Sequence, residues 1–166
     1  AALAGHVNES TVLVLGNLWA DPEQAAAHLP HGQVVWGFPS IGGGFDPNGV
    51  LHGVLFKKMR FGTFRSDPGA RELETRELFQ GSGFSFREQR DYREWLWVNL
   101  AIGAALLPPA LAAGSLRQII TSKSQWKRVR ENMQDAQRVL IARGVDLSAH
   151  RSHLLPARLP TWIFVP

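Results

Sequence analysis

The sequence contains no cysteine among its 166 residues, and this absence excludes whole classes of structure. Disulfide frameworks and metal centres held by thiolates both require cysteine, so neither can stabilise this fold. Charged residues make up only 19% of the chain, and the net charge of +4 is modest for this length. Apolar residues reach 45%, so the composition indicates a globular protein with a buried core rather than a disordered chain.

The chain does not open with a basic segment followed by an apolar run, and the lack of such a secretory signal predicts a cytoplasmic protein. One apolar stretch, residues 95–114, is about long enough to span a bilayer. It contains Asn99, glycines and the pair Pro108-Pro109, and its flanks do not resemble membrane anchors. We therefore expect a buried core helix followed by a turn, and no membrane partner.

The first half of the chain alternates strands and helices. Residues 11–16 and 33–38 are apolar, largely β-branched runs, the pattern of strands that are covered on both faces of a parallel sheet. Between them, Asp21-Pro22-Glu23 has the features of a helix start, and Pro30 ends that helix. The order strand, helix, strand with short links predicts a βαβ unit and hence a parallel sheet.

An antiparallel hairpin and another helix follow. We expect the glycine-rich residues 41–49 to form a loop, and residues 50–56 and 58–64 to form two strands joined by a tight link at the sheet edge. Residues 70–80 predict a helix, and residues 84–86 predict a last short strand.

The second half of the chain reads as helical. Residues 93–107 carry no charge after Glu94, and we expect the apolar helix that they form to break at Pro108-Pro109. Residues 116–143 repeat apolar side chains at helical spacing, which predicts a long amphipathic helix.

The predicted fold class is α/β followed by all-α. It comprises the second half of a Rossmann-type parallel sheet with an antiparallel edge hairpin, and then a helical C-terminal domain. We place the partial cofactor-type domain at residues 1–88 and the helical domain at residues 89–166. The open sheet edge beside residues 11–16 invites self-association, so we expect a homodimer or a marginally stable chain.

The order of short motifs along the chain resembles the ketopantoate reductase (2-dehydropantoate 2-reductase) family. The cofactor domain of that family has a strand ending in Gln-Asn-Gly, a helix, a strand ending in glycine, a loop of small residues, a Pro-Gly pair and a hairpin with histidine. The corresponding segments here are Gly16-Asn17-Leu18, Val34-Val35-Trp36-Gly37, Gly42-Gly43-Gly44, Asn48-Gly49 and Val50-Leu51-His52, with Gly83-Phe84 and Trp95 matching later motifs.

The resemblance implies an oxidoreductase of pantothenate biosynthesis that reduces a 2-oxo acid with NADPH. It implies that Asn17 contacts both cofactor and substrate, that Gly42 and Gly43 contact the cofactor, and that Asn99 contacts the substrate. The residues themselves leave other interpretations open. Asn17 can be a turn former that tolerates a left-handed backbone, and the glycines can simply make a flexible loop.

The family's phosphate-binding turn has no counterpart in this sequence. That turn, Gly-x-Gly-x-x-Gly, opens a helix whose N-terminal N–H groups bind the pyrophosphate. The glycines at 42–44 cannot replace it, because Pro47 and a hairpin follow them instead of a helix.

The family's catalytic lysine is also missing. It stands two residues after the tryptophan that opens the helical domain, and asparagines follow at steps of four. A count from Trp95 leads to Trp97, Ala101 and Ala105, whereas a count from Trp97 leads to Asn99, Gly103 and Leu107. Neither set contains a general acid, so we assign no catalytic residue.

Two hypotheses of function therefore stand. The chain is either a divergent or incomplete NADPH-dependent reductase, or a non-catalytic relative that acts as a structural or protein-interaction module. A Gly-x-Gly-x-x-Gly turn upstream of Ala1 in the natural gene would favour the first hypothesis.

Other patterns in the sequence favour ordinary structural roles. His150 and His153 have metal-ligand spacing but lack a third ligand, so we expect an exposed pair and no metal. His52 is expected to be a satisfied hairpin histidine. The basic residues of 116–143 alternate with Glu131 and Asp135, which indicates a solvated helix face rather than a nucleic-acid surface.

Overall fold

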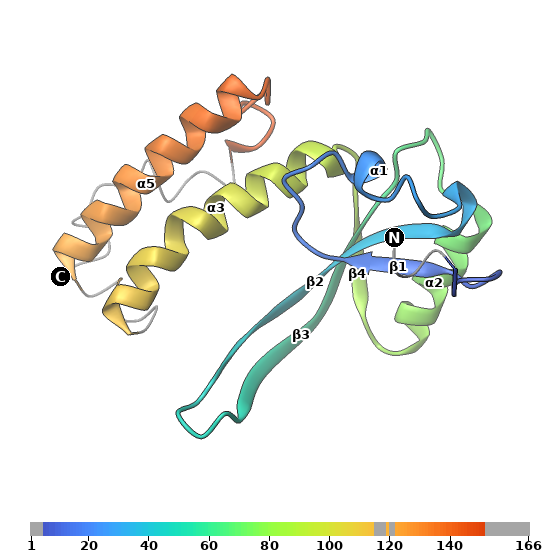
Figure 1. Cartoon of the computed structure of the whole chain (residues 1–166), viewed down its shortest axis with the longest axis horizontal. Coiled ribbons are helices and arrows are strands. Elements are labelled where there is room, and N and C mark those ends of the chain that lie inside the picture. Colours follow the sequence, from blue (N-terminus) through green and yellow to red (C-terminus); the bar gives the residue numbers. More distant parts are fainter. Residues whose placement is uncertain (1–4, 115–118, 120–121, 152–166) are drawn as a thin grey trace. The chain divides into compact units, whose positions relative to one another are not determined.

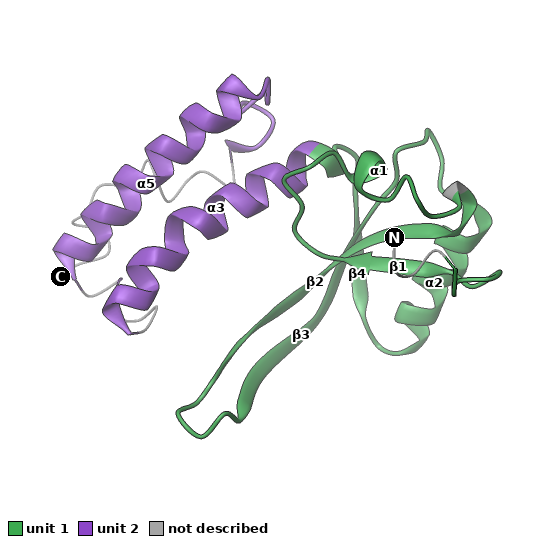
Figure 2. Cartoon of the chain, in the orientation of Figure 1, with its two compact units in different colours: residues 1–93 green, residues 94–166 purple. Residues whose placement is uncertain are grey.

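A computed structural model describes residues 5–114, 119 and 122–151 of the chain. The chain divides into two compact units, Ala1–Arg93 and Glu94–Pro166 (Figure 2). The elements in chain order are β1 (Val12–Leu15), α1 (Pro22–Ala25), η1 (His31–Gln33), β2 (Val34–Phe45), β3 (Leu51–Gly62), α2 (Ala70–Gly81), β4 (Ser85–Gln89), α3 (Tyr92–Ala113) and α5 (Lys123–Ala142).

The first unit is built on a mixed sheet with the strand order β1-β2-β3-β4 (Figure 1). The pairs β1-β2 and β3-β4 are parallel, and the central pair β2-β3 is antiparallel. The parallel pairing of β1 with β2 confirms the βαβ unit predicted from residues 11–38. The sheet followed by helices confirms the predicted fold class.

The hairpin differs from the one predicted. Residues 41–45 are not a loop but continue β2. Residues 51–62 form one strand, β3, rather than the two strands expected at 50–56 and 58–64, and β3 lies within the sheet beside β2 and not at its edge. At Lys57, whose φ is 48°, the expected link is a bulge, because three residues of β3 stand opposite one residue of β2. The prediction was wrong because the glycines at 42–44 allow two strands to pair closely and do not form a flexible turn.

Gly43 shows why glycine is required in that pair. It stands opposite Gly53, and a Cβ atom added to Gly43 would lie 2.4 Å from the backbone oxygen of His52. The turn at the tip is made by Asp46, whose Oδ1 accepts the N–H groups of Asn48 and Val50, both at 2.9 Å. Short-range hydrogen bonds of this kind fix the hairpin register.

The far part of this hairpin extends beyond the rest of the sheet (Figure 1). β1 pairs with β2 only as far as Gly37, and β4 pairs with β3 only from Lys58 onward. We call residues 41–56 the hairpin arm. Within the described part of the chain, no third strand pairs with the arm on either side.

The core of the first unit lies between the sheet and α2. Val35, Met59 and Phe61 are buried there. Phe61 makes edge-on contacts with Phe79 and Phe86, with ring centroids 5.7 and 5.8 Å apart. Edge-to-face rings at this separation add to the stabilisation that burial alone provides.

The second unit packs α3 against α5. Their shared core contains Val98, Ala101, Ala105, Trp126, Val129, Met133 and Leu140. The predicted helix over 116–143 is observed as α5, which starts after the N-cap Ser122, and its predicted beginning at Leu116 lies outside the described residues. Gly144, at φ +89°, follows the C-cap Arg143 of α5, where a left-handed backbone favours glycine.

The expected break at Pro108-Pro109 does not occur, because α3 continues through both prolines to Ala113. Proline has no N–H, so Pro109 leaves the carbonyl of Ala105 without its helical donor. The side chain of Asn132 on α5 donates to that carbonyl through Nδ2 at 3.2 Å. A neighbouring helix thus satisfies the group that the proline exposes, and α3 remains intact.

Replacing Asn132 with alanine should lower the free energy of unfolding by about 1–2 kcal/mol, since it leaves a partly buried carbonyl unpaired. Chemical unfolding followed by tryptophan fluorescence measures this loss. The control is Pro109→Ala, which restores an N–H at position 109. In that background Asn132→Ala should cost clearly less, and an equal cost in both backgrounds would contradict the assignment.

Among the described residues, α3 alone is long and apolar enough to cross a membrane, by length and composition only. Core helices of soluble proteins pass the same test, so this property does not distinguish the two environments.

Candidate functional site

Asn17 lies directly beyond the carboxyl end of β1, which finishes at Leu15. Its side chain is exposed, and the neighbouring parallel strand β2 runs past it in the same direction. In open α/β sheets, ligands bind outside the carboxyl ends of the parallel strands. Asn17 therefore lies at the edge of the sheet where such folds bind ligands, and its contact with a cofactor and a substrate stays a prediction from the resemblance.

Gly42 and Gly43 lie in the hairpin arm, not in a loop at that sheet edge. Gly42 stands opposite Val54 and Gly43 opposite Gly53, and both glycines are exposed. The close approach of the two strands already requires glycine at position 43. Contact of these glycines with a cofactor stays a prediction from the resemblance.

The counts from the two tryptophans lead to different faces of α3. The first count gives Trp97, Ala101 and Ala105, of which the two alanines are buried in the core of the second unit. Trp97 lies under the guanidinium of Arg143, with Cζ 3.9 Å from the ring centroid. These side chains hold α3 and α5 together, so they are unsuited to contact a substrate.

The second count gives residues on the more accessible face of α3. Asn99 and Gly103 are half-buried and Leu107 is exposed. The residues counted from Trp97 are therefore more accessible to a substrate than those counted from Trp95. Asn99 belongs to the second unit and Asn17 to the first.

The single tyrosine of the chain does not replace the missing lysine. Tyr92 is only 1% exposed. Burial raises the pKa of its phenol, which makes that group a poorer proton donor than an ordinary tyrosine. A donor acid therefore has to be sought elsewhere.

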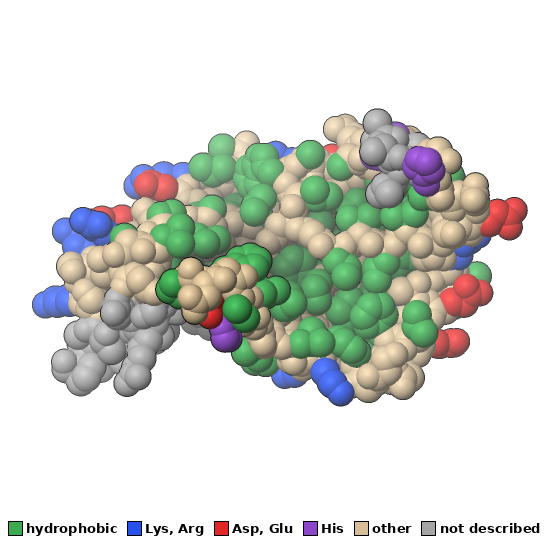
Figure 3. Space-filling view, turned by 60° about the horizontal axis from the view of Figure 1, so that its bottom comes forward, with side chains coloured by type: hydrophobic (Ala, Val, Ile, Leu, Met, Phe, Trp, Pro, Cys, Tyr) green, Lys and Arg blue, Asp and Glu red, His purple; other side chains and the backbone are tan. Residues whose placement is uncertain are grey.

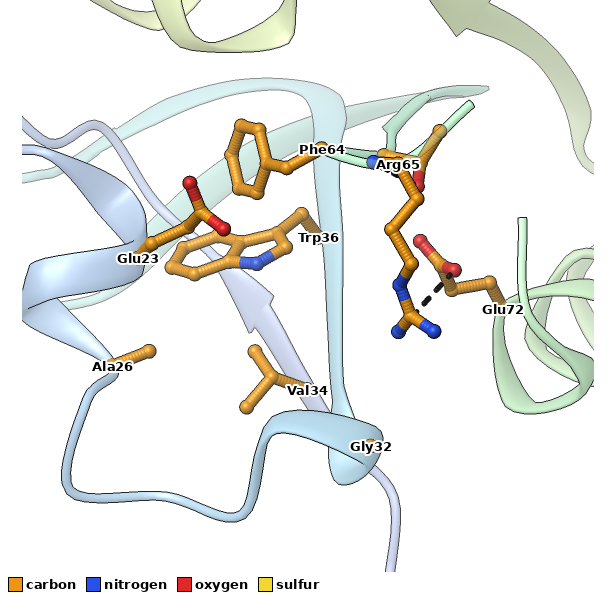
Figure 4. Close-up of a pocket in the computed structure, with 9 residues that line it drawn as sticks. Glu23, Ala26, Gly32, Val34, Trp36, Phe64, Arg65 and Glu72 are labelled. Carbon is orange, nitrogen blue, oxygen red and sulfur yellow. Dashed lines mark hydrogen bonds and ion pairs between the residues drawn. The ribbon is translucent and has the colours of Figure 1, made fainter. Parts of the chain in front are cut away.

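A pocket that the sequence did not predict lies at the opposite, amino end of the parallel strands. It has a volume of about 160 Å³, and Trp36 and Phe64 form an aromatic corner within it (Figure 4). Glu23 lies on one side of the indole, and Arg65 and Glu72 lie on the other. The pocket is thus distinct from the edge that carries Asn17.

The charges around this pocket are balanced within the first unit. Glu72 accepts the backbone N–H of Gly69 at 2.7 Å, and Arg65 lies 4.0 Å from the same carboxylate. Glu23 forms an ion pair with Arg93. The pocket consequently offers no excess charge with which to select an ionic ligand.

The histidines have structural partners. His150 is buried, not exposed as expected, and its Nε2 lies 3.4 Å from the carboxylate of Glu94. His153 lies outside the described residues. His52 pairs with Asp46 at 3.1 Å, which confirms a hairpin role. Within the described ranges, no group of three or more possible ligands could hold a metal ion.

Acid should loosen the tip of the hairpin arm. Hydrogen bonds from the N–H of Val50, and then from His52, hold the pKa of Asp46 below its ordinary value of 3.8. A lowered carboxyl pKa stabilises the folded turn above pH 3.8, and this contribution disappears as the pH falls through the lower folded pKa. The amide resonances of Asn48 and Val50 should therefore titrate below pH 3.8. Asp46→Asn should abolish that titration, and a midpoint at or above 3.8 would contradict the assignment.

Comparison with known structures shows what this chain is similar to. A 2-dehydropantoate 2-reductase from Porphyromonas gingivalis W83 matches 90% of this chain at a TM-score of 0.60 and 15% identity. A dimeric ketopantoate reductase from Staphylococcus aureus matches 99% at a TM-score of 0.64 and 15% identity. D-mandelate dehydrogenase in complex with NADH matches 89% of this chain at a TM-score of 0.64 and 11% identity. Neither the protein-family models nor the curated protein sequences gave a match.

The three matches cover 53%, 61% and 50% of the solved chains, so this chain spans about half the length of its structural neighbours. At these identities the likeness shows a shared fold. The resemblance noted in the sequence is therefore confirmed at the level of the fold, which this chain shares with ketopantoate reductases and a D-mandelate dehydrogenase.

Proposed function

We propose that this chain forms part of a reductase that transfers a hydride from NADPH to the keto group of a 2-oxo acid. The position of Asn17 is the observation that supports this most, since it lies exposed at the carboxyl edge of the parallel strands. The structural neighbours include ketopantoate reductases and a dehydrogenase with NADH. The fold likeness thus supports a nicotinamide dinucleotide as the cofactor.

The described residues fit one part of such a cofactor and not another. The exposed carboxamide of Asn17 can accept and donate hydrogen bonds, as the hydroxyl groups of a ribose and a substrate carboxylate require. The helix after β1 cannot hold the pyrophosphate. The Asp21 carboxylate caps it by accepting the N–H of Glu23 at 3.0 Å, so a negative charge occupies the position that a phosphate would take.

The chemistry that these residues can supply is limited. The bound nicotinamide would provide the hydride, and Asn99 could donate a hydrogen bond to the keto oxygen. An amide has no proton to release, however, so Asn99 cannot act as the general acid. Loss of a general acid typically lowers rates by about 10²–10⁴-fold. We accordingly expect a slow reductase unless another group provides the proton.

A non-catalytic module is the second candidate. The observation in its favour concerns Trp97, which stands at the position of the family's lysine when the count starts from Trp95. Its ring is stacked under the guanidinium of Arg143 within the second unit. In this case the sheet would be an inherited scaffold, and its function would lie in binding a protein partner.

Calorimetric titration of NADPH and NADH into the chain separates the two candidates. The reductase proposal expects micromolar binding that Asn17→Ala weakens about tenfold, the loss of roughly one hydrogen bond. Asn48→Ala, an exposed asparagine in the hairpin turn, is the control and should leave affinity unchanged. If neither NADPH nor NADH binds to the chain, the result would favour the non-catalytic interaction module.

We also propose that the chain forms a homodimer. One structural neighbour, the Staphylococcus aureus ketopantoate reductase, is dimeric. The sheet edge formed by β1 supports the proposal, because β1 pairs only with β2 among the described strands.

A further inference from the structure

Two features of the first unit are candidates for a further binding site: the hairpin arm and the pocket at Trp36. Seven large apolar side chains of the arm are between 51% and 74% exposed, and the space-filling view shows many hydrophobic side chains on its front face (Figure 3). They project from both faces of the ribbon, because Phe45 stands opposite Leu51 on one face and Val54 opposite Gly42 on the other. An apolar surface of this kind does not identify its partner, whereas a pocket with converging polar groups can.

The pocket at Trp36 continues into a second hollow. The first has a volume of about 160 Å³ and the second a volume of about 220 Å³. Both are lined by Gly32, Val34, Arg65 and Glu72, so they adjoin each other. A cavity of about 150 Å³ holds one benzene ring. The first hollow therefore fits a six-membered ring, and the second leaves room for a ring fused to it.

Small side chains keep the space beside the indole open. Val34 and Trp36 are two residues apart on β2, so their side chains project from the same face of the sheet. The ring of Phe64 is tilted against the indole, with centroids 5.8 Å apart, and in the close-up it lies on the side away from Ala26 and Val34 (Figure 4). A Cβ atom added to Gly32 would meet nothing within 4 Å, although Gly32 lines both hollows. The side of the indole turned toward Ala26 and Val34 therefore borders open space.

Polar groups are present on both sides of this open space. Glu23 lies on one side of the indole, and Arg65 and Glu72 lie on the other (Figure 4). The Arg65 side chain is 59% exposed and lies 4.0 Å from the Glu72 carboxylate, so its N–H groups can still donate to a ligand. A carboxylate has about four acceptor positions, so Glu23 can accept a hydrogen bond in addition to the one from Arg93. The pocket thus offers an acceptor at one end and a donor at the other.

We propose that this pocket binds a neutral heteroaromatic ring that carries an amino group, stacked on the indole of Trp36. The amino group would donate to Glu23, and a ring nitrogen would accept from Arg65. The balanced charges give no advantage to an ionic ligand, and a purely apolar ring would leave these polar groups without partners. The pocket lies at the sheet edge opposite to Asn17, so this inference does not depend on the proposed reductase activity.

Calorimetric titration of adenine, a small probe of this class, tests the pocket. The unmodified chain should bind adenine with a Kd of about 0.1–1 mM, an ordinary affinity for a ligand of this size. Gly32→Leu should raise the Kd at least about tenfold, because the leucine side chain would fill the space that the ring needs. Gly81→Leu is the matched control. Gly81 also has nothing within 4 Å but lies at the end of α2 outside the pocket, so the Kd should not change.

Arg65→Met tests the donor end of the pocket. Methionine keeps much of the length of the exposed side chain but removes its N–H groups, so the chain should fold as before, which circular dichroism and thermal unfolding check. The adenine Kd should rise about five- to tenfold, the loss of roughly one hydrogen bond. Indole has no ring nitrogen that accepts a hydrogen bond, so its Kd should change less than about twofold.

Adenine is also a part of NADPH, so the test has to separate the pocket from the opposite sheet edge. Asn17→Ala should leave the adenine Kd unchanged, and in NMR spectra of the unmodified chain adenine should shift the amide signals of Gly32 and Arg65 but not that of Asn17. Adenine that fails to bind up to its solubility limit refutes the proposal. Binding that survives Gly32→Leu, or that Asn17→Ala abolishes, refutes it as well. Adenine binding at the pocket in a chain that binds neither NADPH nor NADH would contradict the proposed function alone.

Discussion

Replacing Gly62 with alanine should destabilise the first unit by more than about 3 kcal/mol, because the new methyl group has no space. A Cβ atom at this position would lie 2.0 Å from Cγ and 2.3 Å from Cβ of Tyr92. Tyr92 is fully buried, and Gly62 sits between Trp36 on β2 and Gln89 on β4. Neither backbone can move without breaking strand pairs. Urea unfolding followed by tryptophan fluorescence measures the loss.

Two further variants sharpen this prediction. Gly81→Ala, at the end of α2, meets nothing within 4 Å and should stabilise the protein by about 0.5–1 kcal/mol. Truncation of Tyr92 to alanine should not rescue Gly62→Ala, because the Cβ atom of residue 92 remains 2.3 Å away. A Gly62→Ala protein as stable as the original would contradict the close contact between Gly62 and Tyr92, the first residue of α3.

Removing Glu88 should cost about 3 kcal/mol, because it leaves a buried guanidinium without its counter-charge. The Arg76 side chain is 4% exposed, and its Nε and Nη2 lie 2.5 and 2.9 Å from the two carboxylate oxygens of Glu88. Its Nη1 donates to the carbonyl of Glu72 at 2.7 Å, and its Cζ lies 5.0 Å from the Phe61 ring centroid. Arg76 therefore cannot turn out to solvent without losing these contacts.

Two controls test the Arg76–Glu88 ion pair: one breaks an exposed ion pair, and the other removes both charges of the buried pair. Glu131→Ala breaks the exposed pair with Lys127, at 3.7 Å, and should change stability by less than about 0.5 kcal/mol. Arg76→Met combined with Glu88→Ala should recover part of the loss, since both charges are then absent. Equal effects of Glu88→Ala and Glu131→Ala would mean that solvent already compensates the buried charge.

Elements with a local signal were predictable from the sequence. The apolar runs at 11–16 and 33–38 and the helix at 70–80 carry their own pattern, and each was found close to its expected place. The place of Asn17 in the chain follows in the same way from the end of β1, whereas its contact with cofactor and substrate stays a prediction. In these cases the information that decides the structure lies within a few neighbouring residues.

Features that depend on a distant partner were not predictable. The strand at 41–45 needs Gly53 opposite Gly43, and the uninterrupted α3 needs Asn132 to satisfy the carbonyl that Pro109 exposes. His150 can be buried because its ring nitrogen Nε2 pairs with the carboxylate of Glu94, which is 56 residues earlier in the chain. The pocket at Trp36 gathers side chains from several elements. Each outcome is decided by tertiary contacts that override a local preference.

The order of the strands also determines how the first unit can fold. The central pair, β2 and β3, is joined by a short turn, and pairing can proceed from Phe45 with Leu51 down to Trp36 with Gly62. The outer strands β1 and β4 join through parallel pairing, which requires longer connections to close. The hairpin is thus the segment expected to form earliest, before either outer strand is available. A refolding chain would then present its apolar arm first, so the rate and yield of refolding should depend on protein concentration.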